Sequence, residues 1–317
     1  MDHWSQYWQN TSSVNSFGEG EYKDGYDGEL ASLWEVFIDT WKVNSKVLDL
    51  GTGNGGLALL CVNMQPNIDM YACDAADIKP SEILNTALEQ FKGLENIQFI
   101  GNQKIEDLAF EDEFFDHIIS QFGLEYSEFN SSLKAIYRTL SKGGSCSFIM
   151  HNNNSFVTHN SATGLKVLSY FLKSGGVLDL LKDFIGFCQQ TLDNHQDNSS
   201  LHTFNILNKE LLQAFKSIRN KLTIDEEIEW FNDVSNSLVV LVQNWRTTRL
   251  DKVTEIEQSL LYFRQRLNEQ VSVAQNNAQM IENLDYCKSL GFEGNFIEVK
   301  INEGVMGWML SLHKNNS

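Results

Sequence analysis

Apolar and polar positions alternate in two different rhythms along this chain of 317 residues. Between residues 46 and 150, short apolar runs rich in β-branched and aromatic residues are separated by longer amphipathic stretches. Such runs are typical of buried parallel strands, and the stretches between them have helical spacing. The predicted strands are 46–50, 69–73, 97–100, 117–120 and 145–150. Strand and helix in this order predict a doubly wound α/β sheet.

The amphipathic stretches carry signals for their own ends. Helices are expected at 55–64, 81–93 and 131–144. The last two finish on glycines, Gly93 and the pair Gly143–Gly144, which is a common way for a helix to end.

The pattern changes after His151. From residue 155 to residue 286 apolar positions recur at helical spacing, and a polar link at 193–203 is expected to be a loop. Segment 236–245, NSLVVLVQNW, is ambiguous between strand and helix and fits a buried helix better. No repeat period is present, so the region is interpreted as a helical insertion. The expected helices are 163–176, 177–192, 208–222, 225–245 and 254–290.

Strand-like residues return near the end of the chain. Segments 294–302 and 307–314 are expected to pair as a terminal hairpin. The expected organisation is an N-terminal aromatic strap at 1–45, a core of 46–154 and 287–317, and the helical insertion at 155–286.

Composition narrows the class of protein. The chain is 42% apolar and 21% charged and has no apolar run of membrane-spanning length, which is typical of a soluble globular protein without a membrane partner. The first twenty residues lack the basic flank and apolar stretch of a signal peptide. Five scattered cysteines, none in a CxxC pair, are expected to be reduced in the cytoplasm. A net charge of −18 disfavours nucleic acid as a partner.

The most informative segment is KVLDLGTGNGG, residues 46–56. A strand that ends at glycines and leads into a helix turns the helix's first N–H groups and positive dipole end toward a ligand. The spacing of the glycines also fits the dinucleotide-binding pattern, Gly51-x-Gly53-x-x-Gly56, so the glycines alone do not identify the ligand. Asp49 is the discriminating residue. A carboxylate two residues before the first glycine would repel a pyrophosphate and favour a cationic ligand that carries an amino acid.

Asp74 ends the next predicted strand, 23 positions after Gly51. A carboxylate at this place can accept hydrogen bonds from both hydroxyls of a ribose. Dinucleotide folds share this feature, so it indicates a nucleoside without choosing between the two ligands. Asp116, by contrast, is interpreted as a residue that opens a strand and fixes the local backbone.

Four motifs stand in order along the chain: VLDLGTGNGG, ACD, FFDHIISQFGLEY, and LSKGG before a strand. In this order they resemble the class I S-adenosylmethionine-dependent methyltransferases. The resemblance covers residues 46–150 and about 288–314. It implies a seven-stranded, mostly parallel sheet whose last strand is antiparallel, in agreement with the terminal hairpin, and S-adenosylmethionine as the cofactor.

The resemblance also implies roles for single residues of the glycine loop. Asp49 would hold the ammonium group of the cofactor, directly or through water. The methionine part of the cofactor would lie against the backbone of Gly51, Thr52, Gly53 and Gly55.

Further residues are implied for the rest of the cofactor. Asp74 would bind the ribose, and Ala75 would flank the adenine. Gln121 and Phe122, just past the fourth strand, would lie beside the sulfonium and the methyl group. The segment GNQKIEDLAF departs from the family's usual aspartate followed by a small apolar residue, so its adenine contacts are the candidates Asn102, Ile105 and Glu106.

Methyl transfer is a direct displacement on carbon, and the cofactor brings the reactivity. A catalytic base is therefore optional. His151 follows the fifth strand and is a candidate base, or else a histidine that organises the loop. Glu125 and Tyr126 are candidates for orienting a polar acceptor, and Tyr126 could equally pack over the cofactor.

No metal site is expected, because His159, His195 and His202 have neither ligand spacing nor a matching cysteine or carboxylate cluster. The N-terminal segment is interpreted either as a strap packed on the domain or as a flap over the site that excludes water. Its aromatic residues are Trp4, Tyr7, Trp8, Phe17 and Tyr22.

The function predicted is methylation of oxygen or nitrogen in a small-molecule or peptide acceptor. No PPY-type segment occurs, which disfavours amino methylation of nucleobases or glutamine. Two alternatives stay open. One is an inactive cofactor-binding interaction protein; the other is a nicotinamide-dependent oxidoreductase, which Gly56 permits and Asp49 opposes. Because it follows the fifth strand, the insertion is expected to form a lid above the active edge of the sheet and much of the acceptor pocket. The long helical stretch 252–285 suggests an alternative, a homodimer formed through the insertion.

Overall fold

A computed structural model gives the fold of residues 2–11, 13–15, 26–80, 82, 91–192 and 198–316. Most of the helix predicted at 81–93 lies outside these residues, as do Phe17, Tyr22 and His195. The chain divides into two compact units. One consists of Met1–Thr158 with Ser272–Ser317, and the other is His159–Val271.

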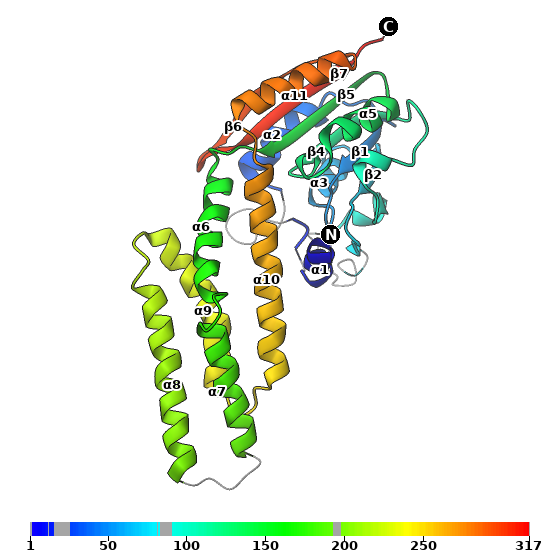
Figure 1. Ribbon diagram of the computed structural model, residues 1–317. Helices are drawn as coiled ribbons and strands as arrows, with labels where there is room; N and C mark the ends of the chain where they lie inside the picture. Colours follow the sequence, from blue (N-terminus) through cyan, green and yellow to red (C-terminus); the bar gives the residue numbers. More distant parts are fainter. Residues whose placement is uncertain are drawn as a thin grey trace. The chain divides into compact units, whose positions relative to one another are not determined.

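The first unit is built on a seven-stranded sheet with the order β3-β2-β1-β4-β5-β7-β6 (Figure 1). The strands are β1 (Lys46–Leu50), β2 (Asp69–Cys73), β3 (Ile97–Ile100), β4 (Phe115–Gln121), β5 (Leu140–His151), β6 (Phe292–Ile301) and β7 (Gly304–Lys314). Strands β1 to β5 pair in parallel, and β7 runs antiparallel to both β5 and β6. The predicted doubly wound sheet with an antiparallel last strand is confirmed.

Helices cover both faces of this sheet, and the side chains of β1 show the division. Val47 packs in one core with α2 (Gly28–Ile38) and α3 (Gly56–Met64). Leu48 and Leu50 pack in the other core with α5 (Phe129–Thr139) and α11 (Asn277–Ser289). Because side chains alternate along a strand, Asp49 lies on the same face as Val47, toward α3.

Lys46 opens the strand, and its N–H donates to Asp116 Oδ2 at 2.9 Å, so Asp116 fixes the local backbone as predicted.

The helix predicted over 131–144 ends earlier than its glycines suggested. It stops at Thr139, and Leu140 already belongs to β5, where it is buried and pairs with Phe115. The expectation that Gly143 and Gly144 terminate a helix was therefore wrong, because burial of Leu140 against the sheet overrides the local glycine signal.

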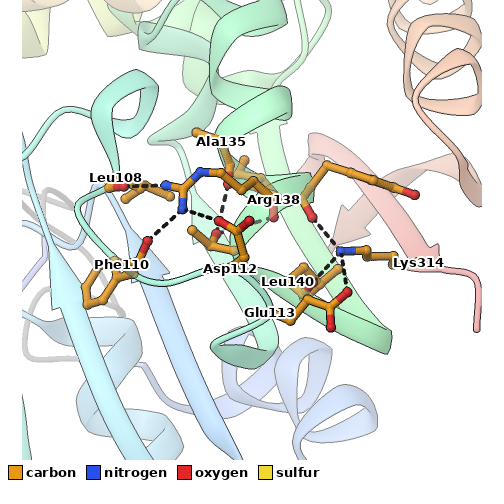
Figure 2. A network of polar contacts seen from close by, with 11 residues as sticks. Leu108, Phe110, Asp112, Glu113, Ala135, Arg138, Leu140 and Lys314 are labelled. Atoms are coloured by element: carbon orange, nitrogen blue, oxygen red, sulfur yellow. Dashed lines mark hydrogen bonds and ion pairs between the residues drawn. The ribbon is translucent and has the colours of Figure 1, made fainter.

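A network of polar contacts fixes this turn from helix to strand (Figure 2). The guanidinium of Arg138, in the last turn of α5, donates to the carbonyl oxygens of Leu108 and Phe110, both at 2.6 Å. The ammonium of Lys314, at the end of β7, donates to the carbonyl oxygen of Leu140 at 2.7 Å. Leu140 is the C-cap of α5, and carbonyl groups at a helix end need partners, which Lys314 supplies here. Arg138 ties the same helix to the loop that contains Leu108 and Phe110.

The helix predicted over 254–290 is two helices, α10 (Leu250–Val273) and α11. Asn276 starts the second one with a capping box. Its side chain accepts from the N–H of Gln279 at 3.0 Å, and the Gln279 side chain accepts from the N–H of Asn276 at 2.8 Å. Helix α11 packs beside β6 in the first unit, so the stretch 252–285 is not one continuous helix.

The second unit is entirely helical in its described residues and has its own apolar core. Its helices are α6 (Phe156–Phe171), α7 (Val177–Leu192), α8 (Asn198–Arg219), α9 (Asp225–Gln243) and most of α10. Segment 236–245 is helical as far as Gln243, as expected, but it is not a buried helix, since Val239 and Val240 are exposed. The polar link expected at 193–203 is helical from Asn198 onward, and the unit's limits lie inside those expected for the insertion, 155–286.

The described helices include none that is long and apolar enough to cross a membrane. The five cysteines are free and buried.

Candidate functional site

The loop between β1 and α3 bends through backbone conformations that favour glycine. Gly51, Gly53 and Gly55 have φ values of +68°, +56° and +91°. A Cβ on Gly51 would lie 2.7 Å from the Cα of Gly123, in the loop after β4. The N–H of Gly51 donates to the carbonyl of Cys73, at the end of β2, at 2.9 Å. The glycine loop is thus held between the carboxyl ends of β2 and β4, the two strands that flank β1.

Asp49 lies beneath this loop and is only 1% exposed. Its Oδ2 accepts a hydrogen bond from the hydroxyl of Thr52 at 2.6 Å. Burial raises the pKa of Asp49 to about 7; the Thr52 hydrogen bond opposes this rise, and the charge of Asp74 adds to it. A cation bound at the loop would offset the cost of ionising Asp49, because an opposite charge favours the carboxylate.

Asp74 joins the glycine loop to the end of β2. Its Oδ2 accepts from the N–H of Gly53, and its Oδ1 accepts from the N–H of Ala76, both at 2.8 Å. Burial raises the pKa of Asp74, and these two hydrogen bonds oppose the rise. Ala75 lies between the bonded residues and is half-buried. Since an ionised carboxylate can accept about four hydrogen bonds, Asp74 has capacity left for ribose hydroxyls.

The structure separates the three residues suggested for adenine. Asn102 is exposed, and its N–H donates to the carbonyl of Ala76 at 3.0 Å, so it lies beside the loop after β2. Ile105 is buried in the core on the α5 face. Glu106 accepts from the N–H of Glu128, just before α5, at 2.8 Å. Asn102 therefore adjoins the β2 loop that carries Asp74.

Gln121 ends β4 in an enclosed position. Its Oε1 accepts from the indole N–H of Trp34 at 2.7 Å, and its Nε2 is buried without a hydrogen-bond partner among the described residues. The bond from Trp34 fixes which end of the amide can donate. The next residue, Phe122, has a φ of +55°, and its ring stacks on His151 with centroids 4.2 Å apart and planes 7° from parallel.

The three candidate catalytic residues lie in one cluster after β4 and at the end of β5. The hydroxyl of Tyr126 is 3.1 Å from His151 Nε2, and the backbone N–H of His151 donates to Glu125 Oε1 at 2.7 Å. Burial raises the pKa of Glu125 to about 7 and lowers the pKa of His151 to about 3. At neutral pH the imidazole is therefore uncharged, and the carboxyl titrates.

The N-terminal helix α1 (Asp2–Asn10) packs on the glycine loop. The side chain of Asn54 is fully buried, and its Nδ2 donates to the carbonyls of Trp8 at 3.0 Å and Ser13 at 3.1 Å. The N–H of Gly56 donates to the carbonyl of Val14 at 3.0 Å. Sequence reasoning missed the role of Asn54. The signal available was a polar residue enclosed between the glycines of GTGNGG.

Helix α1 also contacts the loops after β2 and β4. The N–H of Asp77 donates to the hydroxyl of Ser5 at 2.9 Å, and the amide of Gln9 donates to Asp77 Oδ2 at 2.6 Å. The ring of Trp4 meets that of Tyr126 edge-on, with centroids 5.7 Å apart. The helix therefore touches three loops at the carboxyl edge of the sheet, where open α/β folds bind ligands.

Comparison with known proteins agrees with this geometry. Residues 47–144 match the family model described as a methyltransferase domain. Residues 47–144 are therefore similar to a class I methyltransferase domain. The matched residues include the glycine loop, Asp74 and the loop after β4. S-adenosylmethionine is the cofactor of this class of domain.

The methyltransferase domain has a curated relative in the demethylmenaquinone methyltransferase of Thermus thermophilus. The two are 30% identical over 104 residues, which are 32% of this chain and 46% of that protein. The chain thus spans about half the length of the curated relative it matches.

Solved structures show weaker likenesses. A candidate S-adenosylmethionine-dependent methyltransferase from Listeria monocytogenes is 14% identical, with a TM-score of 0.41 over 90% of this chain and 99% of that one. The PH0226 protein from Pyrococcus horikoshii is 22% identical, with a TM-score of 0.36 over 48% of this chain and 68% of that one.

The residues present fit S-adenosylmethionine. Gly51, Gly53 and Gly55 place no side chain between the loop backbone and a ligand, and their left-handed φ values exclude most other residues. Asp49 supplies negative charge beneath the loop, and Asp74 supplies acceptor oxygens at the end of β2. Gln121 contributes a buried donor that still lacks a partner among the described residues. The described residues include no cluster of three or more histidines, cysteines or carboxylates that could hold a metal ion.

Proposed function

We propose that this chain methylates an oxygen or a nitrogen of a small-molecule or peptide acceptor. The observation that carries the proposal is the buried carboxylate of Asp49 beneath the left-handed backbone of Gly51 and Gly53. This arrangement favours a cationic amino-acid nucleoside over a diphosphate, because a pyrophosphate would meet the charge of Asp49.

In this proposal S-adenosylmethionine supplies an electrophilic methyl group, and the chain supplies binding, orientation and exclusion of water. Asp49 balances the ammonium of the cofactor, and Asp74 accepts from its ribose. Helix α1, held by Asn54, covers the glycine loop and shields the reacting atoms from water. The acceptor binds beside the loop after β4, against the cluster of Tyr126 and His151.

The test is isothermal titration with S-adenosylhomocysteine, followed by transfer of a labelled methyl group to a panel of alcohols, phenols, amines and short peptides. We expect binding that Asp49→Ala weakens strongly and Asp74→Ala weakens less. Binding without transfer to any member of the panel would favour a cofactor-binding interaction protein. Binding of NADH in place of S-adenosylhomocysteine would favour an oxidoreductase.

The proposal extends to partners and location. A net charge of −18 supports acceptors that are not nucleic acids. Five free, buried cysteines support a cytoplasmic location. A homodimer formed through the helical insertion, residues 155–286, stays a prediction, and light scattering on the purified protein tests it.

A further inference from the structure

One carboxyl oxygen of Glu125 accepts a hydrogen bond, and the other has no hydrogen-bond partner among the described residues. Glu125 lies in the short 3-10 helix η4 (Leu124–Tyr126) after β4 and is 7% exposed. Its Oε1 accepts from the backbone N–H of His151 at 2.7 Å. Its Oε2 is enclosed and has no hydrogen-bond partner among the described residues. His151 Nδ1 is likewise buried without a hydrogen-bond partner among the described residues. An unmatched buried polar atom is costly, so the cluster of Glu125 and His151 is suited to a ligand that supplies the missing partners.

His151 is poorly suited to take a proton in the same cluster. Its ring is stacked on Phe122, its Nε2 faces the hydroxyl of Tyr126, and the whole residue is 1% exposed. A second proton would place a cation in an enclosed space, and burial accordingly lowers the pKa of His151 to about 3. Burial moves the pKa of Glu125 the other way, to about 7, where a carboxylate is most effective as a general base at neutral pH.

We propose that Glu125 is the catalytic base, which takes the acceptor's proton on Oε2, and that His151 is a positioning residue. This inference rests on the proposed methyl transfer. The backbone N–H of His151 fixes the plane of the carboxyl group, and the contact of His151 with Tyr126 fixes the position of the strand end that carries that N–H.

The proton and electron balance of the step is simple. The O–H or N–H proton of the acceptor passes to Glu125 Oε2, while the lone pair of that oxygen or nitrogen bonds to the methyl carbon. The bond from that carbon to sulfur breaks, and its electron pair stays on sulfur to give S-adenosylhomocysteine. Glu125 ends as a neutral carboxylic acid and returns its proton to water after the products leave.

The proposal defines the chemical class of the acceptor. It carries a hydrogen on its nucleophilic atom, as an alcohol, a phenol or an uncharged primary or secondary amine does. A tertiary amine or a thioether has no proton for Glu125 to remove.

The experiment compares wild type with Glu125→Gln and with His151→Gln, its matched control. Each protein is first titrated with S-adenosylhomocysteine. If wild type does not bind it, the result contradicts the proposed function and does not bear on the role of Glu125. Methyl transfer to phenols and amines is then measured across pH. We expect Glu125→Gln to bind S-adenosylhomocysteine unchanged, to lose about 100-fold or more in transfer, and to lose the inflection near pH 7. His151→Gln should be slower but should keep an inflection.

A second readout needs no acceptor. In protein with isotopically labelled glutamate carboxyls, the resonance missing from Glu125→Gln identifies Glu125, and its titration is followed by NMR. A midpoint near 7 is expected, and a midpoint near the ordinary 4.5 would overturn the proposal. Transfer by Glu125→Gln with an intact pH inflection, or an inflection lost only in His151→Gln, would overturn it as well.

Discussion

The indole of Trp8 lies against Gly53 so closely that a Cβ at position 53 would fall 2.4 Å from the ring. Gly53 also has a φ of +56° and donates its N–H to Asp74. We expect Gly53→Ala to lower the free energy of unfolding by about 1–3 kcal/mol, through backbone strain, and to reduce affinity for S-adenosylhomocysteine by displacing α1. Chemical unfolding and calorimetric titration measure the two effects.

Gly175→Ala is the matched control. Gly175 has a similar φ of +69°, but a Cβ there meets nothing within 4 Å. Gly175→Ala should lower the free energy of unfolding through backbone strain without reducing the affinity for S-adenosylhomocysteine. Equal affinities for the two variants would mean that Trp8 does not bear on the cofactor site.

Asn54 is expected to control how fast the cofactor leaves. Asn54→Ala removes two buried hydrogen bonds to the backbone of residues 8 and 13, which should loosen α1 by about 2 kcal/mol and speed release of S-adenosylhomocysteine. Stopped-flow fluorescence gives the release rate, and hydrogen exchange reports on residues 2–11. Asn10→Ala, which alters an exposed contact within α1 to Gln6, should leave both unchanged. An unaltered release rate in Asn54→Ala would exclude α1 as a cover.

Asp49 should destabilise the free protein as pH rises. Its folded-state pKa of about 7 exceeds the ordinary 3.8, so between these values the folded state binds more protons than the unfolded state, and stability falls with increasing pH. Asp49→Asn should remove this penalty, up to about 4 kcal/mol above neutral pH, while weakening S-adenosylhomocysteine binding. Unfolding by denaturant at acid and alkaline pH tests the sign. The exposed Asp39→Asn serves as control, and a pH slope that is the same in wild type and Asp49→Asn would contradict the electrostatic account.

Trp34 should affect binding through Gln121. Trp34→Phe removes the donor that fixes the amide, so Gln121 Nε2 loses its orientation and affinity for S-adenosylhomocysteine should fall about tenfold. Trp41→Phe changes another buried tryptophan of the same core and should cost stability without this loss. If both variants bound alike, the orientation of Gln121 would be irrelevant to the ligand.

The sequence was sufficient for three of the strands because most of their residues are at least partly buried. Residues 46–50, 69–73 and 97–100 were predicted with the limits that the structure shows. Continuous apolar runs bounded by turn residues leave little choice of limits. The glycine loop was equally clear, since its backbone conformation admits few other residues.

The ends of helices and strands that depend on tertiary contacts or on capping could not be predicted. The stretch 131–144 has helical spacing throughout, yet pairing of Leu140 with Phe115 turns its end into strand. The break at Asn276 depends on a capping box that one amphipathic pattern hides. In the site, helical spacing did not reveal that Asn54 binds the carbonyl of Trp8, because that bond spans 46 positions.

The most direct measurement is calorimetric titration of wild type, Asp49→Asn and Asp74→Asn with S-adenosylhomocysteine and, separately, with NADH. The account predicts that wild type binds S-adenosylhomocysteine and not NADH, and that loss of the Asp49 charge weakens binding by about tenfold or more. Binding of NADH, or binding of S-adenosylhomocysteine that is indifferent to position 49, would contradict it.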